Sequence, residues 1–137
     1  MKLNYKKISA SSAVMAFALV GFALSLQAAN LSDQDKEFLA AYGTAHDALV
    51  ADDLAGAKKA GADLGPDAVD LSKSNSLDEA RAAFGKLSDK AVKLAAGQSG
   101  YHIAHCPMLN KDWVQTSTTI ANPYGGKEMI SCGEIQK

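Results

Sequence analysis

The chain lacks the sequence patterns of the common catalytic sites. Its two cysteines, Cys106 and Cys132, form neither the Cys-x-x-Cys motif of thioredoxin-like redox proteins nor the Cys-x-x-Cys-His motif of covalent haem. There is no Gly-x-Ser-x-Gly nucleophile motif, no phosphate-binding loop and no constellation of paired carboxylates. We therefore expect a protein that is not an enzyme.

Large aromatic residues are also few, and basic residues are not in excess. The chain has one tryptophan, four tyrosines and four phenylalanines, and it uses alanine heavily, which suits closely packed helices. Its net charge is −1, and it becomes −4 without the first 29 residues. Nucleic-acid binding requires a basic surface, so that partner is excluded. The remaining residues, about 108, suffice for one domain with a modest core.

The N-terminal segment has the pattern of a secretory signal peptide. Residues 1–7 carry three lysines, residues 8–26 are apolar and uncharged, and small residues follow at Ala28 and Ala29. A run of about 19 apolar residues can also span a bilayer as an uncleaved anchor. Its many serines and alanines favour cleavage instead, after Ala28 or Ala29. No cysteine follows for a lipid anchor, so we predict a signal peptide at residues 1–29 and a periplasmic domain at residues 30–137.

The first two thirds of this domain predict helices. Ser32 precedes the first one as a cap, and Ser76 with Glu79 has the spacing of a capping box before the clearest one. A weaker apolar stripe lies between them, over residues 54–64. Apolar residues at helical spacing mark the first face at Phe38, Tyr42, Ala45 and Leu49, and the last at Leu77, Ala80, Phe84, Leu87, Ala91 and Leu94. The fold class is mainly α, an antiparallel bundle of three to four helices.

The period changes in the C-terminal lobe, residues 101–137. Residues 101–106 and 127–132 alternate as strands do, and we predict that they form a two-stranded antiparallel pair. Between them we expect a short helix over residues 112–118 and a turn over residues 122–126. The strand pair would bring two groups of sulfur-containing residues together. These groups are Cys106 with Met108, and Met129 with Cys132.

These sulfur-containing residues suggest a site for a soft metal. Thiolate and thioether ligands together favour Cu(I), because thioether is a poor ligand for zinc and for hard cations. Strand alternation puts His102 on the face opposite His105, so His102 ranks below it as a ligand. The indole of Trp113 can lie against a bound cation. The predicted metal ligands are His105, Cys106, Met108, Met129 and Cys132, with His102 and Trp113 as second-rank candidates.

A disulfide is the alternative reading of the two cysteines. Cysteine pairs in exported proteins commonly form disulfides, and closing the 25-residue loop between Cys106 and Cys132 stabilises a fold by about 3 kcal/mol. An oxidised pair would still leave His105, Met108 and Met129 as weaker donors. From the residues alone, both readings remain open.

Three groups of residues also carry a resemblance. They are Tyr42, Ala48-Leu49, Asp52-Asp53, Arg81, Phe84 and Leu87-Ser88 in the helical part; residues 105–108 before Trp113, Val114 and Gln115; and Ile120, residues 122–124, Gly126-Lys127, Met129 and Cys132-Gly133 at the end. With these motifs the chain resembles a bacterial domain family of unknown function. That family occurs alone in exported proteins and fused to periplasmic adaptor subunits of heavy-metal efflux pumps. Gly125 departs from it, because the family usually has an aromatic residue there, and the segment between Met108 and Trp113 is short.

The resemblance implies a helical bundle with a Cys/Met lobe and a role in handling copper or other heavy metals. Our first hypothesis is an exported protein that binds Cu(I) for sequestration, transfer or resistance. The second is a non-catalytic interaction module with a structural disulfide between Cys106 and Cys132. In that case the bundle face or residues 122–126 would dock on an efflux adaptor or another envelope protein.

Overall fold

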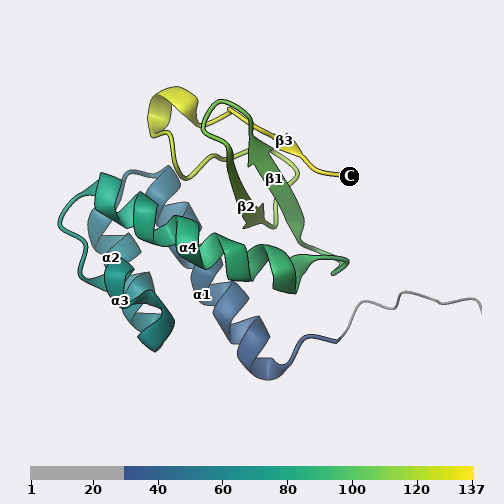
Figure 1. Ribbon diagram of the computed structural model, residues 1–137, viewed down its shortest axis with the longest axis horizontal. Helices are drawn as coiled ribbons and strands as arrows, with labels where there is room; N and C mark the ends of the chain where they lie inside the picture. The colour runs from purple at the N-terminus through teal and green to yellow at the C-terminus, as the bar shows by residue number, and fades with distance from the viewer. Residues whose placement is uncertain (1–29) are drawn as a thin grey trace, which may run out of the picture.

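The computed structural model describes residues 30–137, which form a helical base and a small lobe built on a three-stranded sheet (Figure 1). The predicted signal peptide lies outside the described residues. The prediction of a mainly helical bundle with a C-terminal lobe is confirmed. The base contains α1 (Asp33–Val50), α2 (Leu54–Asp63), the 3-10 turn η1 (Gly65–Ala68), α3 (Val69–Ser72) and α4 (Leu77–Ala95). The lobe contains β1 (His102–Cys106), β2 (Lys111–Gln115), the 3-10 turn η2 (Lys127–Met129) and β3 (Glu134–Ile135).

The two long helices begin at the predicted caps. The hydroxyl of Ser32 accepts the N–H of Asp35 at 3.1 Å, and that of Ser76 accepts the N–H of Glu79 at 3.2 Å. The carboxylate of Glu79 accepts the N–H of Asn75 rather than that of Ser76. The reciprocal bond of the predicted capping box is therefore displaced by one residue. In the part of the chain that the structure describes, none of the helices is both long and apolar enough to cross a membrane.

Small residues let the helices of the base approach closely. Ala45, Ala57 and Ala80 are all completely buried. A methyl group on Gly61 would lie 2.7 Å from the backbone nitrogen of Ser72, so α2 and α3 are in direct contact there. Larger side chains fill the rest of this core, among them Leu39, Tyr42, Leu49, Leu71 and Phe84.

The sheet has β1 in its centre, with antiparallel partners β2 and β3 on either side. The helix predicted over residues 112–118 is wrong, because this segment contains most of β2. The hairpin between β1 and β2 turns at residues 107–110, where Asn110 adopts a left-handed conformation with φ 50°. Three residues of β2 are then buried, namely Trp113, Val114 and Gln115.

The strand predicted over residues 127–132 is also wrong. Gly126, with φ 68°, leads into η2, and the N–H of Met129 bonds to the carbonyl of Gly126 at 3.1 Å. The N–H of Cys132 then bonds to the carbonyl of Met129 at 2.9 Å. These local hydrogen bonds take the place of a strand ladder. The alternation of apolar residues over this segment therefore did not indicate a strand.

A row of aromatic rings joins the base to the lobe. Adjacent rings have centroids between 4.5 and 6.3 Å apart, within the range of favourable aromatic contacts. The row begins in α1, crosses α4 and ends in β2. Its members, in spatial order, are Phe38, Tyr42, Phe84, Tyr124 and Trp113. Base and lobe therefore share one core.

Polar side chains make further connections between the two parts. The buried hydroxyl of Tyr42 accepts the backbone N–H of Val114 in β2 at 3.3 Å. Arg81 of α4 donates from Nε to the carbonyl of Pro123 at 3.1 Å and forms an ion pair with Asp52. Residues 122–124 are thus fixed on the helical base rather than extended into solvent.

Candidate functional site

Cys106 and Cys132 lie side by side, with their Sγ atoms 2.6 Å apart. Cys106 is the last residue of β1 and is completely buried, whereas Cys132 follows η2 and is half-buried. The predicted proximity of the two cysteines is confirmed, although a turn and not a strand delivers Cys132. Both are free thiols here.

The hairpin turn surrounds the Cys106 sulfur with hydrogen-bond donors. Sγ accepts the backbone N–H groups of Met108 and Leu109, a side-chain N–H of Asn122, and a hydrogen bond from Cys132. Burial raises the pKa of the Cys106 thiol, but these bonds outweigh it, and the pKa falls below its ordinary value. The bond to Cys106 and burial raise the pKa of Cys132. Cys106 is therefore the sulfur that carries negative charge first.

Asn122 connects the two cysteines. It is buried, with 1% of its surface exposed, and its Nδ2 donates to the carbonyl of Cys132 at 2.9 Å as well as to the sulfur of Cys106. Its Oδ1 accepts the N–H of Tyr124 at 2.8 Å. The sequence predicted only a turn at this residue. The bond to Tyr124 is typical of such a turn, but the contacts with the cysteines depend on the tertiary fold.

The two methionines of the predicted site differ in their surroundings. Met108 lies in the hairpin turn, where its backbone N–H donates to both sulfurs, and 77% of its surface is exposed. Met129 is half-buried against Gly125, where a methyl group would lie 3.0 Å from the Met129 Sδ. Glycine at position 125 therefore leaves the space that the Met129 side chain occupies.

His105 and Trp113 have other partners than the cysteines. His105 neighbours Cys106 in β1, so its side chain projects from the opposite face of the sheet, where Nδ1 lies 2.7 Å from the carboxylate of Asp112. Trp113 is completely buried, donates from its indole N–H to Gln115 at 2.9 Å, and packs against Gly133. Its surroundings are those of a core residue.

His102 lies at the start of β1, far from the end that carries Cys106, and it pairs in register with Gln115. A strand of five residues places its ends about 13 Å apart. Within residues 30–137, histidine, cysteine and carboxylate side chains nowhere gather in a group of three or more that suits a metal ion.

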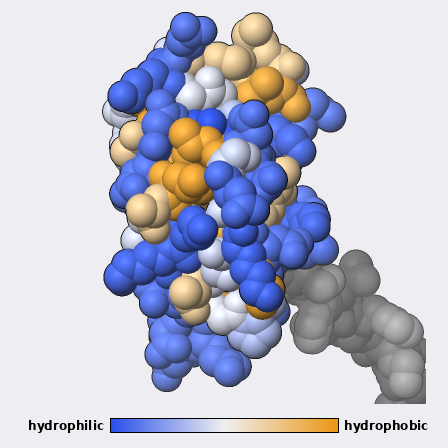
Figure 2. Space-filling view, turned by 90° about the vertical axis from the view of Figure 1, so that its left-hand side faces the viewer, coloured by the Kyte–Doolittle hydropathy of each residue, from blue (hydrophilic) through white to orange (hydrophobic). Residues whose placement is uncertain are grey.

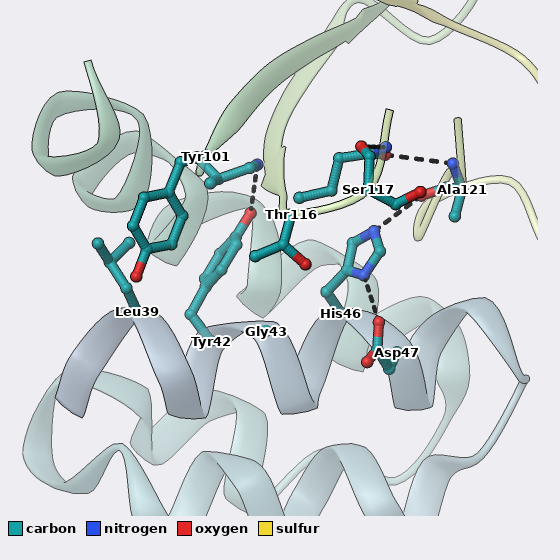
Figure 3. A pocket seen from close by; sticks show the side chains of 11 residues that line it. Leu39, Tyr42, Gly43, His46, Asp47, Tyr101, Thr116, Ser117 and Ala121 are labelled. Carbon is teal, nitrogen blue, oxygen red and sulfur yellow. Dashed lines mark hydrogen bonds and ion pairs between the residues drawn. The ribbon is translucent and has the colours of Figure 1, made fainter. Parts of the chain in front are cut away.

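A separate hollow of about 120 Å³ lies between α1 and the segment after β2 (Figure 3). His46 lines it, but both ring nitrogens are engaged, Nδ1 with the Asp47 carboxylate at 2.9 Å and Nε2 with the Ala121 carbonyl at 2.8 Å. His46 is thus a buried core residue with both ring nitrogens satisfied. It anchors the segment that leads to Asn122.

Gln115 makes the corresponding anchor from β2, a role that we did not predict from the sequence. Its side-chain amide donates from Nε2 to the carbonyls of Ser117 and Thr119 at 2.6 and 2.7 Å. Its Oε1 accepts the N–H of Ala121 at 3.2 Å. One buried amide thus shapes the loop that carries Asn122 to the cysteines. A polar residue at the end of a buried strand was the available signal.

Comparison of the chain with protein-family models, with curated proteins and with solved structures finds no match.

Proposed function

We propose that this protein, in its reduced state, binds Cu(I) through Cys106 and Cys132, with a thioether from Met108 or Met129. The observation that carries the proposal is the convergence of both thiols, 2.6 Å apart, beside the turn that contains Met108. Thiolate and thioether are soft ligands, and this combination selects Cu(I) over zinc and hard cations. His105 is left out because its side chain lies on the other face of β1.

The chemistry of the pair fits a metal after a small movement. With metal–thiolate bonds of about 2.3 Å, two sulfurs in a tetrahedral or trigonal site are about 3.8–4.0 Å apart. The pair must therefore open by about 1 Å, and half-buried Cys132, which follows a turn, is the freer of the two to move. The N–H groups aimed at Cys106 stabilise the thiolate that binding requires, and binding releases the thiol protons.

The exposure of Met108 supports a role outside the core. On the face seen in Figure 2, hydrophobic residues form small patches that hydrophilic residues separate. Across residues 30–137, the large hydrophobic side chains with most exposure are Val69 at 42%, Ile130 at 40% and Met108 at 77%. Met108 contributes little to packing, yet its thioether is accessible to an arriving ion.

The setting of this role remains the one expected from the sequence. We propose that the chain is exported to the periplasm with cleavage after Ala28 or Ala29, and that it sequesters copper, transfers it or contributes to heavy-metal resistance without catalysis. The resemblance to domains fused to efflux adaptors supports this setting. An adaptor or another envelope protein is then the protein partner we propose.

A Cu(I) competition titration of the reduced protein tests the binding proposal. We expect one equivalent to bind, with affinity lost in Cys106→Ser and reduced in Met108→Leu or Met129→Leu. Leucine keeps the volume of methionine and removes only the sulfur. His105→Ala is the matched control, because it alters the residue next to Cys106 on the opposite face. A preference for zinc over Cu(I) that both methionine variants leave unchanged, or no metal binding at all, contradicts the proposal.

The interaction module is the second candidate, and the short Sγ–Sγ separation favours it as well. Oxidation of the pair would close a structural disulfide and leave no thiolate for copper. Residues 122–126 then offer little surface for docking, because Asn122 and Pro123 are buried and Arg81 covers the Pro123 carbonyl. Intact mass of the exported protein, with and without thiol alkylation, distinguishes a permanent disulfide from free thiols.

A further inference from the structure

We propose that Cys106 and Cys132 form a reversible redox pair that exchanges with thiols, with Cys132 as the sulfur under attack and Cys106 as the leaving thiolate. The chain has no Cys-x-x-Cys motif, but the fold brings the two cysteines to 2.6 Å across 25 residues of sequence. The environments of the two sulfurs differ in the two respects that direct such an exchange, namely access and stabilisation of negative charge.

Access is the first difference. Cys106 has no exposed surface, because β1, the hairpin turn and Asn122 enclose it. Cys132 is half-buried and follows the turn at residues 130–131, at the edge of the lobe. An external thiolate therefore reaches the Cys132 sulfur and not the Cys106 sulfur. A buried structural disulfide would instead protect both sulfurs.

Stabilisation of the leaving group is the second difference. Two backbone N–H groups, of Met108 and Leu109, and the Asn122 amide point at the Cys106 sulfur. Asn122 cannot turn away easily, because its other bonds hold the Cys132 carbonyl at 2.9 Å and the Tyr124 N–H at 2.8 Å. These donors are in place before the S–S bond breaks, and a stabilised thiolate leaves faster.

The exchange balances with a small thiol as the only co-reactant. The thiolate RS⁻ attacks Cys132 Sγ, the S–S bond breaks, and its electron pair goes to Cys106 as thiolate. A second RS⁻ attacks the sulfur of the R group, which forms RSSR and releases Cys132, and the two cysteines take up protons from water. The protein disulfide is reduced and two thiols are oxidised. The reverse sequence, with RSSR, oxidises the pair.

This chemistry has one consequence that rests on the proposed function. Only the reduced pair offers two thiolates to Cu(I). Oxidation by a small disulfide would then release the metal, and thiols would restore the site. The exchange itself needs no metal, so it can be tested in the presence of a chelator. Its success or failure is therefore separate from the copper titration.

The test uses the oxidised wild-type protein, glutathione and an acid quench, followed by alkylation, digestion and mass spectrometry. We expect mixed disulfide on Cys132 and alkylated Cys106, with the Cys132 adduct in about tenfold excess or more. Adducts mainly on Cys106 overturn the proposal. So does a disulfide that glutathione does not reduce in the folded protein but does reduce in the same protein in denaturant.

Single-cysteine variants give an independent measurement of the same asymmetry. With oxidised glutathione, Cys106→Ser leaves the accessible Cys132, and we expect it to form the mixed disulfide readily. Cys132→Ser leaves the enclosed Cys106, and we expect it to react at least about tenfold more slowly. Fluorescence of Trp113 checks that both variants are folded. Equal rates in two folded variants contradict the assigned roles.

Discussion

The helical base and the lobe are each stabilised by a different kind of interaction. In the base, completely buried alanines and a few large apolar residues pack at helical spacing, and most hydrogen bonds are local to each helix. In the lobe, buried and half-buried polar side chains from both parts of the molecule bind backbone groups of residues 117–132, some of them near in sequence and some distant. The main ones are His46 to Ala121, Arg81 to Pro123, Gln115 to Ser117 and Thr119, and Asn122 to Cys132.

This difference predicts different responses to substitution. An apolar contact in the base is one of many, and neighbouring side chains can partly fill a small loss. A polar anchor in the lobe satisfies specific buried groups, and its removal leaves them without a partner. The lobe is thus the part in which single polar residues decide the geometry, and it is also the part that carries the cysteines.

Trp113→Ala gives the largest expected effect. The indole is completely buried between Tyr124 and Gly133, and its loss leaves a cavity worth about 3–5 kcal/mol of unfolding free energy. Urea denaturation followed by far-UV circular dichroism measures this change. Leu71→Ala, a completely buried residue of the base, is the matched control, with an expected loss of about 2–5 kcal/mol.

The two variants are compared through the cysteines. With Trp113→Ala, we expect thiol alkylation of Cys106 in the absence of denaturant, because the lobe opens at this site. With Leu71→Ala, we expect Cys106 to stay protected until the whole chain unfolds. If both variants expose Cys106 equally, base and lobe act as one unit and the comparison between them breaks down.

Asn122→Ala is expected to cost about 2–3 kcal/mol, because the carbonyl of Cys132 and the N–H of Tyr124 both lose their side-chain partner. We expect urea denaturation to report this loss and thiol titration to report a higher pKa at Cys106, since one donor to its sulfur is gone. Asn75→Ala, on the exposed surface before α4, is the control. An unchanged Cys106 pKa in Asn122→Ala would contradict the role of the amide.

The sequence predicted the base better than the lobe for a physical reason. Caps at Ser32 and Ser76 and apolar residues at helical spacing are local signals, and both long helices begin where these signals place them. In the lobe, η2 arises from Gly126 in a left-handed conformation, and β2 from pairing with β1. These depend on contacts between distant residues, which a single sequence does not reveal.

The candidate site divides in the same way. The sequence identified Cys106 and Cys132 by their rarity, and the fold brings them together. Strand alternation by itself separates His105 from its neighbour Cys106, but the predicted ligand set did not apply it to this pair, and the structure places His105 against Asp112. Asn122 was recognised as a turn former, while its contacts with the cysteines come from residues 10 and 16 positions away.

Tyr42→Phe tests the hydroxyl that links the two parts. Its removal leaves the Val114 N–H without a partner and shortens the chain of hydroxyl groups through Ser88, at a cost of about 1 kcal/mol. Burial raises the pKa of Tyr42 above its ordinary value of 10.0. Above pH 10 the unfolded chain therefore loses this proton while the folded chain retains it, and stability falls as the pH rises.

The expected result is that wild type and Tyr42→Phe differ less in unfolding free energy as the pH increases above 10. Urea denaturation at a series of pH values measures this convergence. Burial also raises the pKa of Tyr124, so the variant keeps part of the alkaline sensitivity. Tyr101→Phe, outside the hydroxyl chain, is the control. Parallel stability curves for Tyr42→Phe would show that the hydroxyl acts only as a hydrogen-bond partner.

Lys86→Ala is expected to have the smallest effect, and it probes the base at its surface. Lys86 bonds the Asp70 carboxylate at 2.9 Å and thereby lowers the Asp70 pKa, but both side chains are at least 70% exposed. Water and salt screen such a pair, so we expect the thermal midpoint to stay within experimental error at low and at high salt. A clear, salt-dependent loss would mean that the base also relies on specific polar contacts. Both parts would then depend on polar contacts, and they would differ only in how deeply those contacts are buried.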